Sequence, residues 1–242
     1  MDKVSFGHDE VSPEEKTRRV RGVFSSVASS YDLMNDLMSG GQHRLWKHEF
    51  VRKVRPRKGE AILDMAGGTG DIAFRLARAG ASVTVADINP EMLAVGVERA
   101  EKNGLLGLVW AEENAEALSF VERSFDAYTI AFGIRNVTDI PAALAEAHRV
   151  LKTGGRFFCL EFSKTRWPGF ATLYETYSRR VVPRLGKAVA KDEDSYRYLI
   201  ESIERFPDMA RFARMIEAAG FGNVKAEPIL GGLVAIHSGW KT

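Results

Sequence analysis

From residue 61 onward, short apolar runs alternate with longer segments whose apolar positions recur every three or four residues. The short runs predict strands: AILDMA, SVTVADIN, LGLVWAEENA, SFDAYTIAFGI and RFFCLEFS. The segments between them predict helices: DIAFRLARAG, PEMLAVGVERAEKNG and DIPAALAEAHRVLKTGG. Strands that alternate with helices form a parallel sheet joined by helical crossovers. The pattern therefore predicts an α/β fold with a mostly parallel, twisted sheet.

The first part of the chain has a helical pattern instead. Residues 12–58 read as helices, and Ser12 is suited to an N-cap, with Pro13 at the first helical position and Glu15 three residues after the cap. The pattern changes to strands only at residue 61. We therefore expect a helical N-terminal cap over residues 1–58.

The last third of the chain returns to helices before it ends in strands. Residues 167–218 read as mostly helical, beginning with WPGFATLYETYSRRVV. The strands FGNVKAEPIL and GGLVAIHSGW follow, and the glycine pair between them predicts an antiparallel hairpin. The sequence thus predicts a sheet domain over residues 59–242 with a helical insertion at about 167–218, in one compact domain overall.

Composition indicates the class of protein and its cellular location, but not its function. The 242 residues are 45% hydrophobic and 27% charged with a net charge of +2, the balance of an ordinary globular protein. The single cysteine, Cys159, excludes an intramolecular disulfide framework. The chain starts with a polar segment, and no apolar run approaches the roughly 20 residues of a membrane-spanning helix. We therefore expect a cytoplasmic protein, either free or bound to the inner face of a membrane.

The first strand ends in a glycine turn, ILDMAGGTGD. Gly68, Thr69 and Gly70 open the string GTGDIA, which matches the dinucleotide-binding pattern between a strand and a helix. Such glycines let a backbone approach a ligand closely, although a purely structural turn is the alternative. A Walker A loop is excluded because no Gly-Lys-Ser/Thr follows.

Charge discriminates between the ligands that this turn could hold. Asp64 ends the strand before the turn and Asp71 begins the helix after it. Two carboxylates about 6 Å away, at an effective dielectric near 20, would each repel a unit negative charge by roughly 3 kcal/mol. A pyrophosphate is therefore disfavoured. S-adenosylmethionine fits better, because its sulfonium and α-amino groups are cationic and its one carboxylate can be held by the N–H groups of the turn.

Two further strand ends carry suitable polar groups. Asp87 ends the second strand, where an acidic side chain can accept hydrogen bonds from ribose hydroxyls, although it or Asn89 could instead cap the next helix. Asn114 and Ala115 follow the third strand at the edge where an adenine would lie, although a polar turn explains them equally well. The three strand ends together predict a class I S-adenosylmethionine-dependent methyltransferase with a Rossmann-like sheet.

Longer segments resemble one known family. YDLMNDLMS, DMAGGTGDIAF, TIAFGIRNVTDIPAAL, RFFCLEFSK, DSYRYLIESIERFPD and GLVAIHSGWK are similar to the ubiquinone/menaquinone biosynthesis C-methyltransferases, from about Tyr31 to Lys241. The resemblance implies transfer of a methyl group to a ring carbon of a polyprenylated quinol. The substrate would be demethylmenaquinol, the methoxy-polyprenyl-benzoquinol of the ubiquinone pathway, or both.

The resemblance also implies cofactor positions. It assigns Thr69, Asp87 and Asn114-Ala115 to S-adenosylmethionine. Ala131 stands where some relatives have a serine, so a hydroxyl contact there is lost or replaced by a backbone contact. No cluster of Cys, His or Asp has the spacing of metal ligands, and we expect no metal.

The chemistry needs a group that stabilises a phenolate, since a phenol has a pKa near 10 and its ring carbon becomes nucleophilic on deprotonation. Arg135, just past the fourth strand, is the first candidate, and Asn136 could orient the ring. A salt bridge to Asp139 or a surface position is the alternative for Arg135. Tyr31 could close over the substrate, although packing explains it equally well. No histidine stands out as a general base.

A polyprenyl tail implies a membrane surface as a partner. The segment HRLWKHEFVRKVRPRK reads as a basic amphipathic helix suited to anionic lipid, or as a helix packed against the domain with a solvated face. An RNA or protein methyltransferase is the main rival function, but the sequence contains no RNA-binding module, and we expect no nucleic acid partner. A scaffold without catalysis and an NAD-dependent oxidoreductase are weaker rivals. A homodimer or a quinone-biosynthesis complex stays open.

Overall fold

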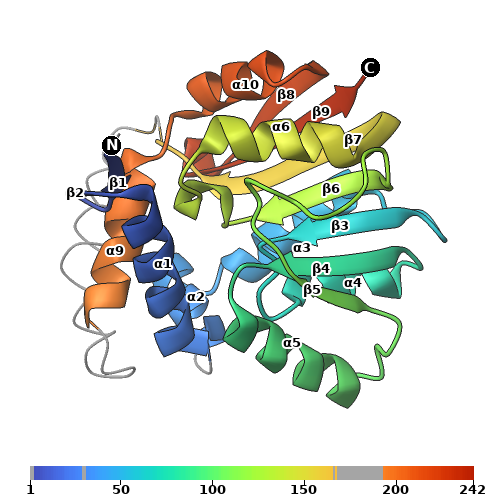
Figure 1. Ribbon diagram of the computed structural model, residues 1–242, viewed down its shortest axis with the longest axis horizontal. Coiled ribbons are helices and arrows are strands. Elements are labelled where there is room, and N and C mark those ends of the chain that lie inside the picture. Colours follow the sequence, from blue (N-terminus) through green and yellow to red (C-terminus); the bar gives the residue numbers. More distant parts are fainter. Residues whose placement is uncertain (1–2, 29–30, 166, 168–192) are drawn as a thin grey trace.

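The computed structural model describes residues 3–28, 31–165, 167 and 193–242. Its central sheet contains β3 (Ala61–Met65), β4 (Ser82–Asp87), β5 (Val109–Glu112), β6 (Phe125–Ala131), β7 (Leu151–Phe162), β8 (Phe221–Ile229) and β9 (Val234–Lys241). The strand order is β5-β4-β3-β6-β7-β9-β8 (Figure 1). The five strands β3, β4, β5, β6 and β7 are parallel to one another, and β9 is antiparallel to both β7 and β8. The predicted wound sheet with a C-terminal hairpin is confirmed.

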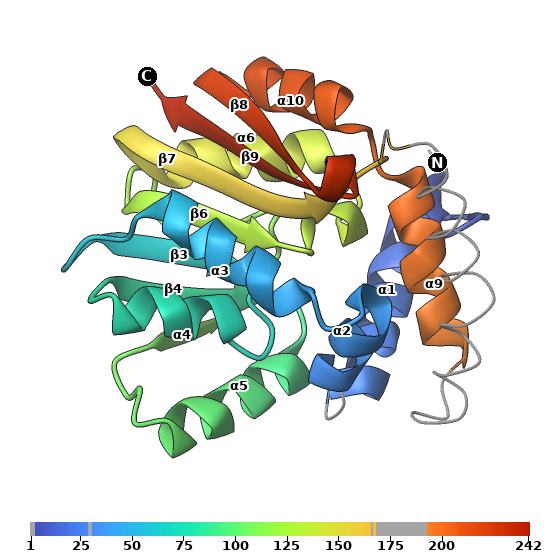
Figure 2. The ribbon, with the colours of Figure 1, turned by 180° about the vertical axis from the view of Figure 1, so that it is seen from behind.

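Helices cover both faces of this sheet. Figure 2 shows α3 (His43–Val54) and α4 (Asp71–Arg78) on one face, while α6 (Ile140–Val150) and α10 (Met209–Ala218) pack on the other. Helix α5 (Pro90–Lys102) starts after Asn89, whose side chain accepts a hydrogen bond from Met92 N at 3.0 Å. Capping groups of this kind satisfy N–H groups that have no partner within the helix.

A third group of helices lies beside the carboxyl ends of the parallel strands. It consists of α1 (Pro13–Val27), α2 (Tyr31–Ser39) and α9 (Glu193–Arg205), and it is preceded by a short hairpin of β1 (Val4–Phe6) and β2 (Asp9–Val11) (Figure 1). Ser12 caps α1 as predicted, accepting a hydrogen bond from Glu15 N at 3.2 Å. These helices share a small core of their own, formed by Val20, Val27, Met34, Tyr196, Tyr198, Leu199 and Ile200. The predicted helix WPGFATLYETYSRRVV lies outside the described residues, apart from Trp167.

Helix α3 packs on the sheet and is not part of this third group. Its residues Trp46, Phe50 and Val54 are buried in the same core cluster as strands β3, β4 and β7. The apolar side of the basic segment is therefore occupied by the sheet, and Leu45, 71% exposed, is the exception. Helix α3 is therefore packed against the domain, which is one of the two expectations from the sequence. The other expectation, that its apolar side faces a membrane, is wrong.

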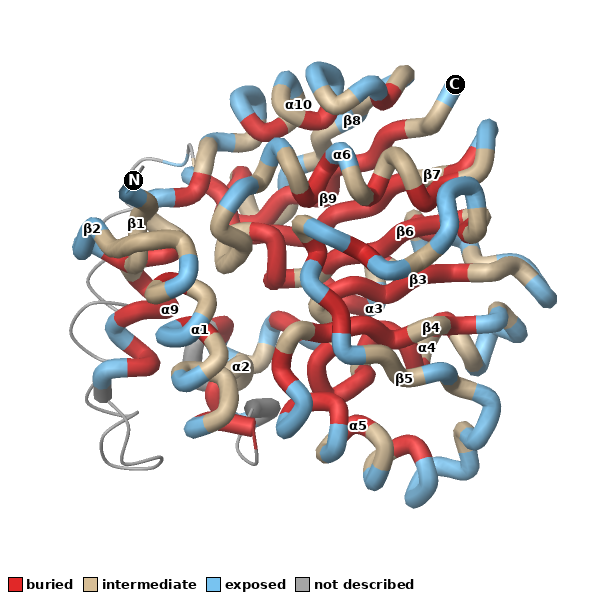
Figure 3. Tube along the Cα trace, viewed as in Figure 1, coloured by how far each residue is buried: buried red, intermediate tan, exposed pale blue. Residues whose placement is uncertain are grey.

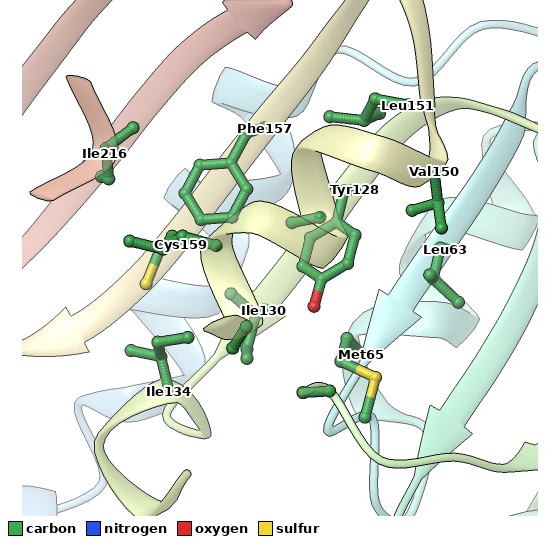
Figure 4. Close-up of a cluster of buried hydrophobic side chains, with 14 of the residues drawn as sticks. Leu63, Met65, Tyr128, Ile130, Ile134, Val150, Leu151, Phe157, Cys159 and Ile216 are labelled. Atoms are coloured by element: carbon green, nitrogen blue, oxygen red, sulfur yellow. The ribbon is translucent and has the colours of Figure 1, made fainter. Parts of the chain in front are cut away.

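The main core lies between the sheet and helices α6 and α10. Figure 4 shows Tyr128 and Phe157 stacked there, with ring centroids 5.6 Å apart, beside Cys159. Figure 3 shows the buried strands and the exposed outer sides of the helices. Strand β7 starts at Leu151, earlier than predicted, because this fully buried residue pairs with Phe125 of β6 and cannot continue α6.

The turn of the C-terminal hairpin lies where the sequence predicts it. Strands β8 and β9 are joined by a single-turn 3-10 helix, η4 (Leu230–Gly232), in which Gly231 has φ +63° and Gly232 has φ +94°. Glycine adopts these left-handed conformations without the strain that other residues meet. The glycine pair therefore makes the turn that the sequence predicted.

Candidate functional site

A cavity lies at the carboxyl ends of β3, β4, β5 and β6. It contains about 740 Å³ of space, part of it open to solvent. Its walls from the sheet side are Met65, Ala66, Gly68, Asp87, Ile88, Asn89, Met92, Asn114, Ala115, Glu116, Phe132, Gly133, Asn136, Val137 and Thr138. Helix α1 supplies the remaining wall through Thr17, Val20, Arg21 and Phe24. The carboxyl ends of parallel strands are where α/β sheets bind ligands.

The glycine turn brings its backbone close to the end of β4. Gly68 has φ +52°, and its N–H donates a hydrogen bond to Asp87 Oδ2 at 2.9 Å. Gly70 has φ +84° and precedes α4, and a Cβ there would lie 2.7 Å from the Phe74 ring. Gly68 lines the cavity, whereas Gly70 shapes the turn and does not reach the cavity. The tight-turn role thus accounts for Gly70, and the missing Cβ of Gly68, which would lie 2.9 Å from Met92 Cε, lets the turn pack closely against the start of α5.

With Glu116, Asp87 is one of two acidic residues among the described residues that line the cavity. It is 9% exposed, and its second oxygen accepts a hydrogen bond from Asn89 N at 2.9 Å. Burial raises the pKa of its carboxyl to about 6, while hydrogen bonds from the backbone of Asn89 and Gly68 oppose that rise. Asn89, not Asp87, caps α5. Asp87 is therefore free of the capping role, and each of its oxygens keeps lone pairs for hydroxyl groups of a ligand.

Asp64 lies behind the glycine turn and does not line the cavity. It is 1% exposed, and its Oδ1 accepts a hydrogen bond from the Thr129 hydroxyl at 2.7 Å. Its Oδ2 has no hydrogen-bond partner among the described residues, and a Cβ on Gly67 would lie 3.2 Å from that atom. Burial raises the pKa of the Asp64 carboxyl to about 7. Asp64 can therefore act on a ligand only across the turn, through its charge.

Four other sequence candidates fall into two groups. Asn114 and Ala115 line the cavity beside the end of β5, and Asn114 Oδ1 accepts a hydrogen bond from Glu116 N at 3.0 Å. Thr69 and Ala131 do not line it. The Thr69 hydroxyl is buried and accepts a hydrogen bond from Arg99 Nη1 at 2.7 Å, on the side of α5. The structure therefore places only the first pair where a ligand can be touched.

Arg135 is turned away from the cavity into a buried ion pair. Its Nη1 lies 2.7 Å from Glu161 Oε1 on β7 and also donates to Phe132 O at 2.6 Å. The Arg135 side chain is 5% exposed and that of Glu161 is 0% exposed. Burial raises the pKa of Glu161, and the charge of Arg135 opposes the rise. The expected alternative partner, Asp139, is wrong, because Asp139 caps α6 through Ala142 N.

Asn136 lines the cavity, and its side chain is hydrogen-bonded to Tyr198 of helix α9. The Tyr198 hydroxyl on α9 lies 3.1 Å from Asn136 Oδ1 and donates a hydrogen bond to it. Tyr198 is in turn stacked on Phe6 of β1, with ring centroids 4.2 Å apart. The Asn136 amide group is thus oriented by an element outside the sheet. Tyr31 begins α2, but its side chain lies outside what the structure describes.

Sequence reasoning missed the wall from α1 and the partner of Arg135. The α1 residues at positions 17, 20, 21 and 24 share one helical face, but Thr, Val, Arg and Phe give that face no apolar signature. Glu161 had a signal, since it is a charged residue inside the apolar run FFCLEF. A charge in a buried strand needs a partner.

The described residues contain no group of three or more His, Cys, Asp or Glu side chains arranged to hold a metal ion. Within the same part of the chain, no helix is both long enough and apolar enough to cross a membrane.

Residues 12–241 match a family described as the ubiE/COQ5 methyltransferase family. A similar protein, the ubiquinone/menaquinone biosynthesis C-methyltransferase UbiE of Zymomonas mobilis, is 67% identical over 241 residues, which is 100% of both chains. The mitochondrial 2-methoxy-6-polyprenyl-1,4-benzoquinol methylase of Arabidopsis thaliana is 54% identical over 98% of this chain and 90% of that protein.

Solved structures with little sequence identity share the fold. A SAM-dependent methyltransferase from Aquifex aeolicus is 15% identical, with a TM-score of 0.65 over 90% of this chain and 98% of that chain. The phosphoethanolamine N-methyltransferase 2 of Haemonchus contortus, in complex with phosphomonomethylethanolamine and S-adenosylhomocysteine, is 16% identical. Its TM-score is 0.67 over 96% of this chain and 60% of that chain.

Proposed function

The chain belongs to the ubiE/COQ5 methyltransferase family, and from this premise we propose that it transfers a methyl group from S-adenosylmethionine to a ring carbon of a polyprenylated quinol. The observation that carries the proposal is the cavity that brings Gly68, Asp87, Asn114 and Ala115 together at the strand ends. The printed names of the relatives cover both the ubiquinone and the menaquinone pathway. We propose demethylmenaquinol, the methoxy-polyprenyl-benzoquinol, or both as substrates.

The residues of the cavity fit this cofactor. Asp87 can accept hydrogen bonds from the two ribose hydroxyls, and Asn114 with Ala115 borders the space for the adenine. The backbone of the turn at Gly68 can approach the methionyl part, and Asp64 behind the turn favours its cationic groups. When bound, the cofactor supplies an electrophilic methyl group, and the protein has to place the ring carbon in line with it.

We propose that Asn136 contacts the ring hydroxyl, and that Arg135, which is turned away from the cavity, acts on the phenolate through its charge alone. Asn136 borders the cavity and is oriented by Tyr198, so its amide can hydrogen-bond to the hydroxyl and fix the ring. Arg135 is the adjacent cation, and its role in stabilising the phenolate stays a prediction. The ion pair with Glu161 holds the guanidinium in place and shares its charge. Tyr31 stays a candidate for closing over the ring.

A polyprenyl tail resides in a lipid bilayer, so we propose that the enzyme works as a peripheral protein on the cytoplasmic face of the membrane. The exposed side of α3 supports this with Arg44 and Arg52, next to the exposed Leu45. A homodimer or a quinone-biosynthesis complex stays a prediction. We propose no role for nucleic acid.

The experiment that tests the function uses methyl-labelled S-adenosylmethionine with reduced short-tail demethylmenaquinol and methoxy-benzoquinol in parallel, with RNA as a control. We expect label on a quinol ring carbon and none in RNA. Label on one quinol only would identify the pathway. Cofactor binding without label on either quinol would contradict the proposed substrate class while retaining the cofactor.

Asp87→Ala is expected to weaken binding of S-adenosylhomocysteine by at least about 100-fold, as measured by calorimetry. The variant removes a charged acceptor for two hydroxyl groups, and hydrogen bonds to charged groups contribute about 1.5–3 kcal/mol each. It also removes the acceptor for Gly68 N, which holds the turn. Asp126→Ala is the matched control, because Asp126 also accepts from a backbone amide, that of Ala61, but does not line the cavity. Unchanged affinity in Asp87→Ala would remove Asp87 from the cofactor site.

A further inference from the structure

We propose that Arg21, on the N-terminal helix α1, is a cofactor-binding residue that contacts the adenosine part of S-adenosylmethionine. The inference rests on the proposed function, since it assumes that the cavity holds this cofactor. It adds a residue from outside the sheet to a site whose other candidates all lie at strand ends.

One face of α1 forms the wall of the cavity opposite the sheet. Thr17, Val20, Arg21 and Phe24 lie along this face, at spacings of three and four residues. Arg21 carries the one positive charge among the described residues that line the cavity, which also include the acidic Asp87 and Glu116. Figure 1 shows α1 beside the carboxyl ends of the parallel strands. A ligand between α1 and the sheet would therefore meet Arg21 on one side and Asp87 on the other.

Hydrogen bonds fix Arg21 at the ends of β4 and β5. Its carbonyl oxygen accepts from Asn89 Nδ2 at 3.0 Å, and its Nη2 donates to Glu112 Oε1 at 2.9 Å. Asn89 follows β4, and Glu112 is the last residue of β5. The start of α1 is fixed elsewhere, by Lys16 Nζ on Val137 O at 2.7 Å, beyond β6. Arg21 therefore lies toward the adenosine end of the site, where Asp87 and Asn114 also lie.

The guanidinium has an unused donor. Arg21 Nε is buried and has no hydrogen-bond partner among the residues that the structure describes, although Nη2 of the same group donates to Glu112. A buried donor without an acceptor is costly, so native proteins rarely leave one. Adenosine offers acceptors in its ribose hydroxyls and its ring nitrogens.

The charge of Arg21 also favours the form of Asp87 that the ribose needs. Asp87 is the neighbouring carboxylate, and the positive charge of Arg21 opposes the rise of its pKa that burial causes. An ionised Asp87 can accept two hydroxyl hydrogen bonds, whereas the neutral form must donate one proton. Arg21 would thus act on adenosine directly and through Asp87.

A structural role for Arg21 is the competing explanation. Its ion pair with Glu112 joins α1 to β5, and both side chains are about half exposed, at 43% and 51%. Exposed ion pairs of this kind contribute little to stability. If docking of α1 were the whole role, removal of either partner should have the same small effect on cofactor binding.

The test compares Arg21→Gln with two matched variants by calorimetric titration of S-adenosylhomocysteine into the full chain. Arg21→Gln is expected to weaken binding by at least about tenfold, since a charge-assisted hydrogen bond is lost. Arg18→Gln, on the same helix, removes an exposed pair with Glu15 and should stay within about twofold of the native protein. Glu112→Gln, which removes the ion pair and retains the guanidinium, should also stay within about twofold.

Further readouts separate the outcomes. In turnover assays, Arg21→Gln should raise KM for S-adenosylmethionine more than it lowers kcat. Arg21→Lys keeps the charge but lacks the Nε donor, and it should also bind less tightly than the native protein. Native affinity in Arg21→Gln, or an equal loss in Glu112→Gln, would overturn the inference. If the native protein itself failed to bind S-adenosylhomocysteine, the proposed function would fail instead.

Discussion

Replacement of Glu161 by alanine is expected to lower the free energy of unfolding by about 3–5 kcal/mol. The variant leaves the guanidinium of Arg135, 5% exposed, without the carboxylate that lies 2.7 Å from it. It also removes the acceptor of Phe162 N. A buried charge without a counter-charge is far more costly than the net stabilisation of the intact pair. Urea denaturation of the variant and the native protein at one pH measures the difference.

A surface pair provides the control for this prediction. Glu49 accepts two hydrogen bonds from Arg52 within α3, but the Arg52 side chain is 58% exposed and that of Glu49 is 35% exposed. Glu49→Ala should therefore cost less than about 1 kcal/mol. Equal losses in Glu161→Ala and Glu49→Ala would show that Arg135 reaches water once its partner is removed.

A double variant separates the stability of the pair from its role in catalysis. Arg135→Met combined with Glu161→Leu replaces both charges by apolar side chains, and such replacements are often neutral or stabilising. The double variant should therefore recover most of the stability that Glu161→Ala loses. If Arg135 stabilises the phenolate, the folded double variant should still bind S-adenosylhomocysteine but should methylate the quinol slowly. Normal turnover would remove Arg135 from the mechanism.

The local parts of this fold are readable from sequence because their causes are local. Ser12 caps α1 through Glu15 N, three residues away, and the glycine pair of the hairpin supplies the left-handed conformations that its turn needs. The strands alternate with helices, and the hydrophobic period alone predicts that order. The residues that follow parallel strands must gather at one edge, so Asp87, Asn114 and Ala115 are brought together as predicted.

The parts that sequence reasoning missed depend on contacts between distant residues. The partner of Arg135 is 26 positions away on another strand, and Asp139 was nearer in sequence. The polar and apolar positions of α3 fit both a membrane and a sheet, and only packing places Trp46 and Phe50 in the core. The cavity wall from α1 follows from how the third group of helices docks. Hydrophobic periodicity predicts which side of a helix is apolar, but it does not predict which part of the protein that side packs against.

Asp64→Asn is expected to stabilise the protein at pH 8, by as much as roughly 4 kcal/mol, from a pKa that burial raises by about three units. The unfolded carboxyl ionises near pH 3.9, but the folded one, at 1% exposure, ionises only near pH 7. The folded state therefore binds the extra proton between these values, and native stability falls as the pH rises from about 4 to 7. Asparagine removes that loss and retains the Oδ1 acceptor for Thr129.

The same variant should bind the cofactor less well, and the two effects together identify the role of Asp64. The carboxylate of Asp64 lies behind the glycine turn, so its negative charge favours a cationic ligand over a neutral one, whereas Asp71 is paired with Lys47 and Arg75. Affinity for S-adenosylmethionine should therefore fall more than affinity for uncharged-sulfur S-adenosylhomocysteine. Asp126→Asn is the control. The hydrogen bond from Lys152 lowers the pKa of the Asp126 carboxyl, so loss of this charge should make the protein less stable. A more stable Asp64→Asn with unchanged preference for the sulfonium would leave the buried carboxylate without a function, since nothing would then offset its cost to the fold.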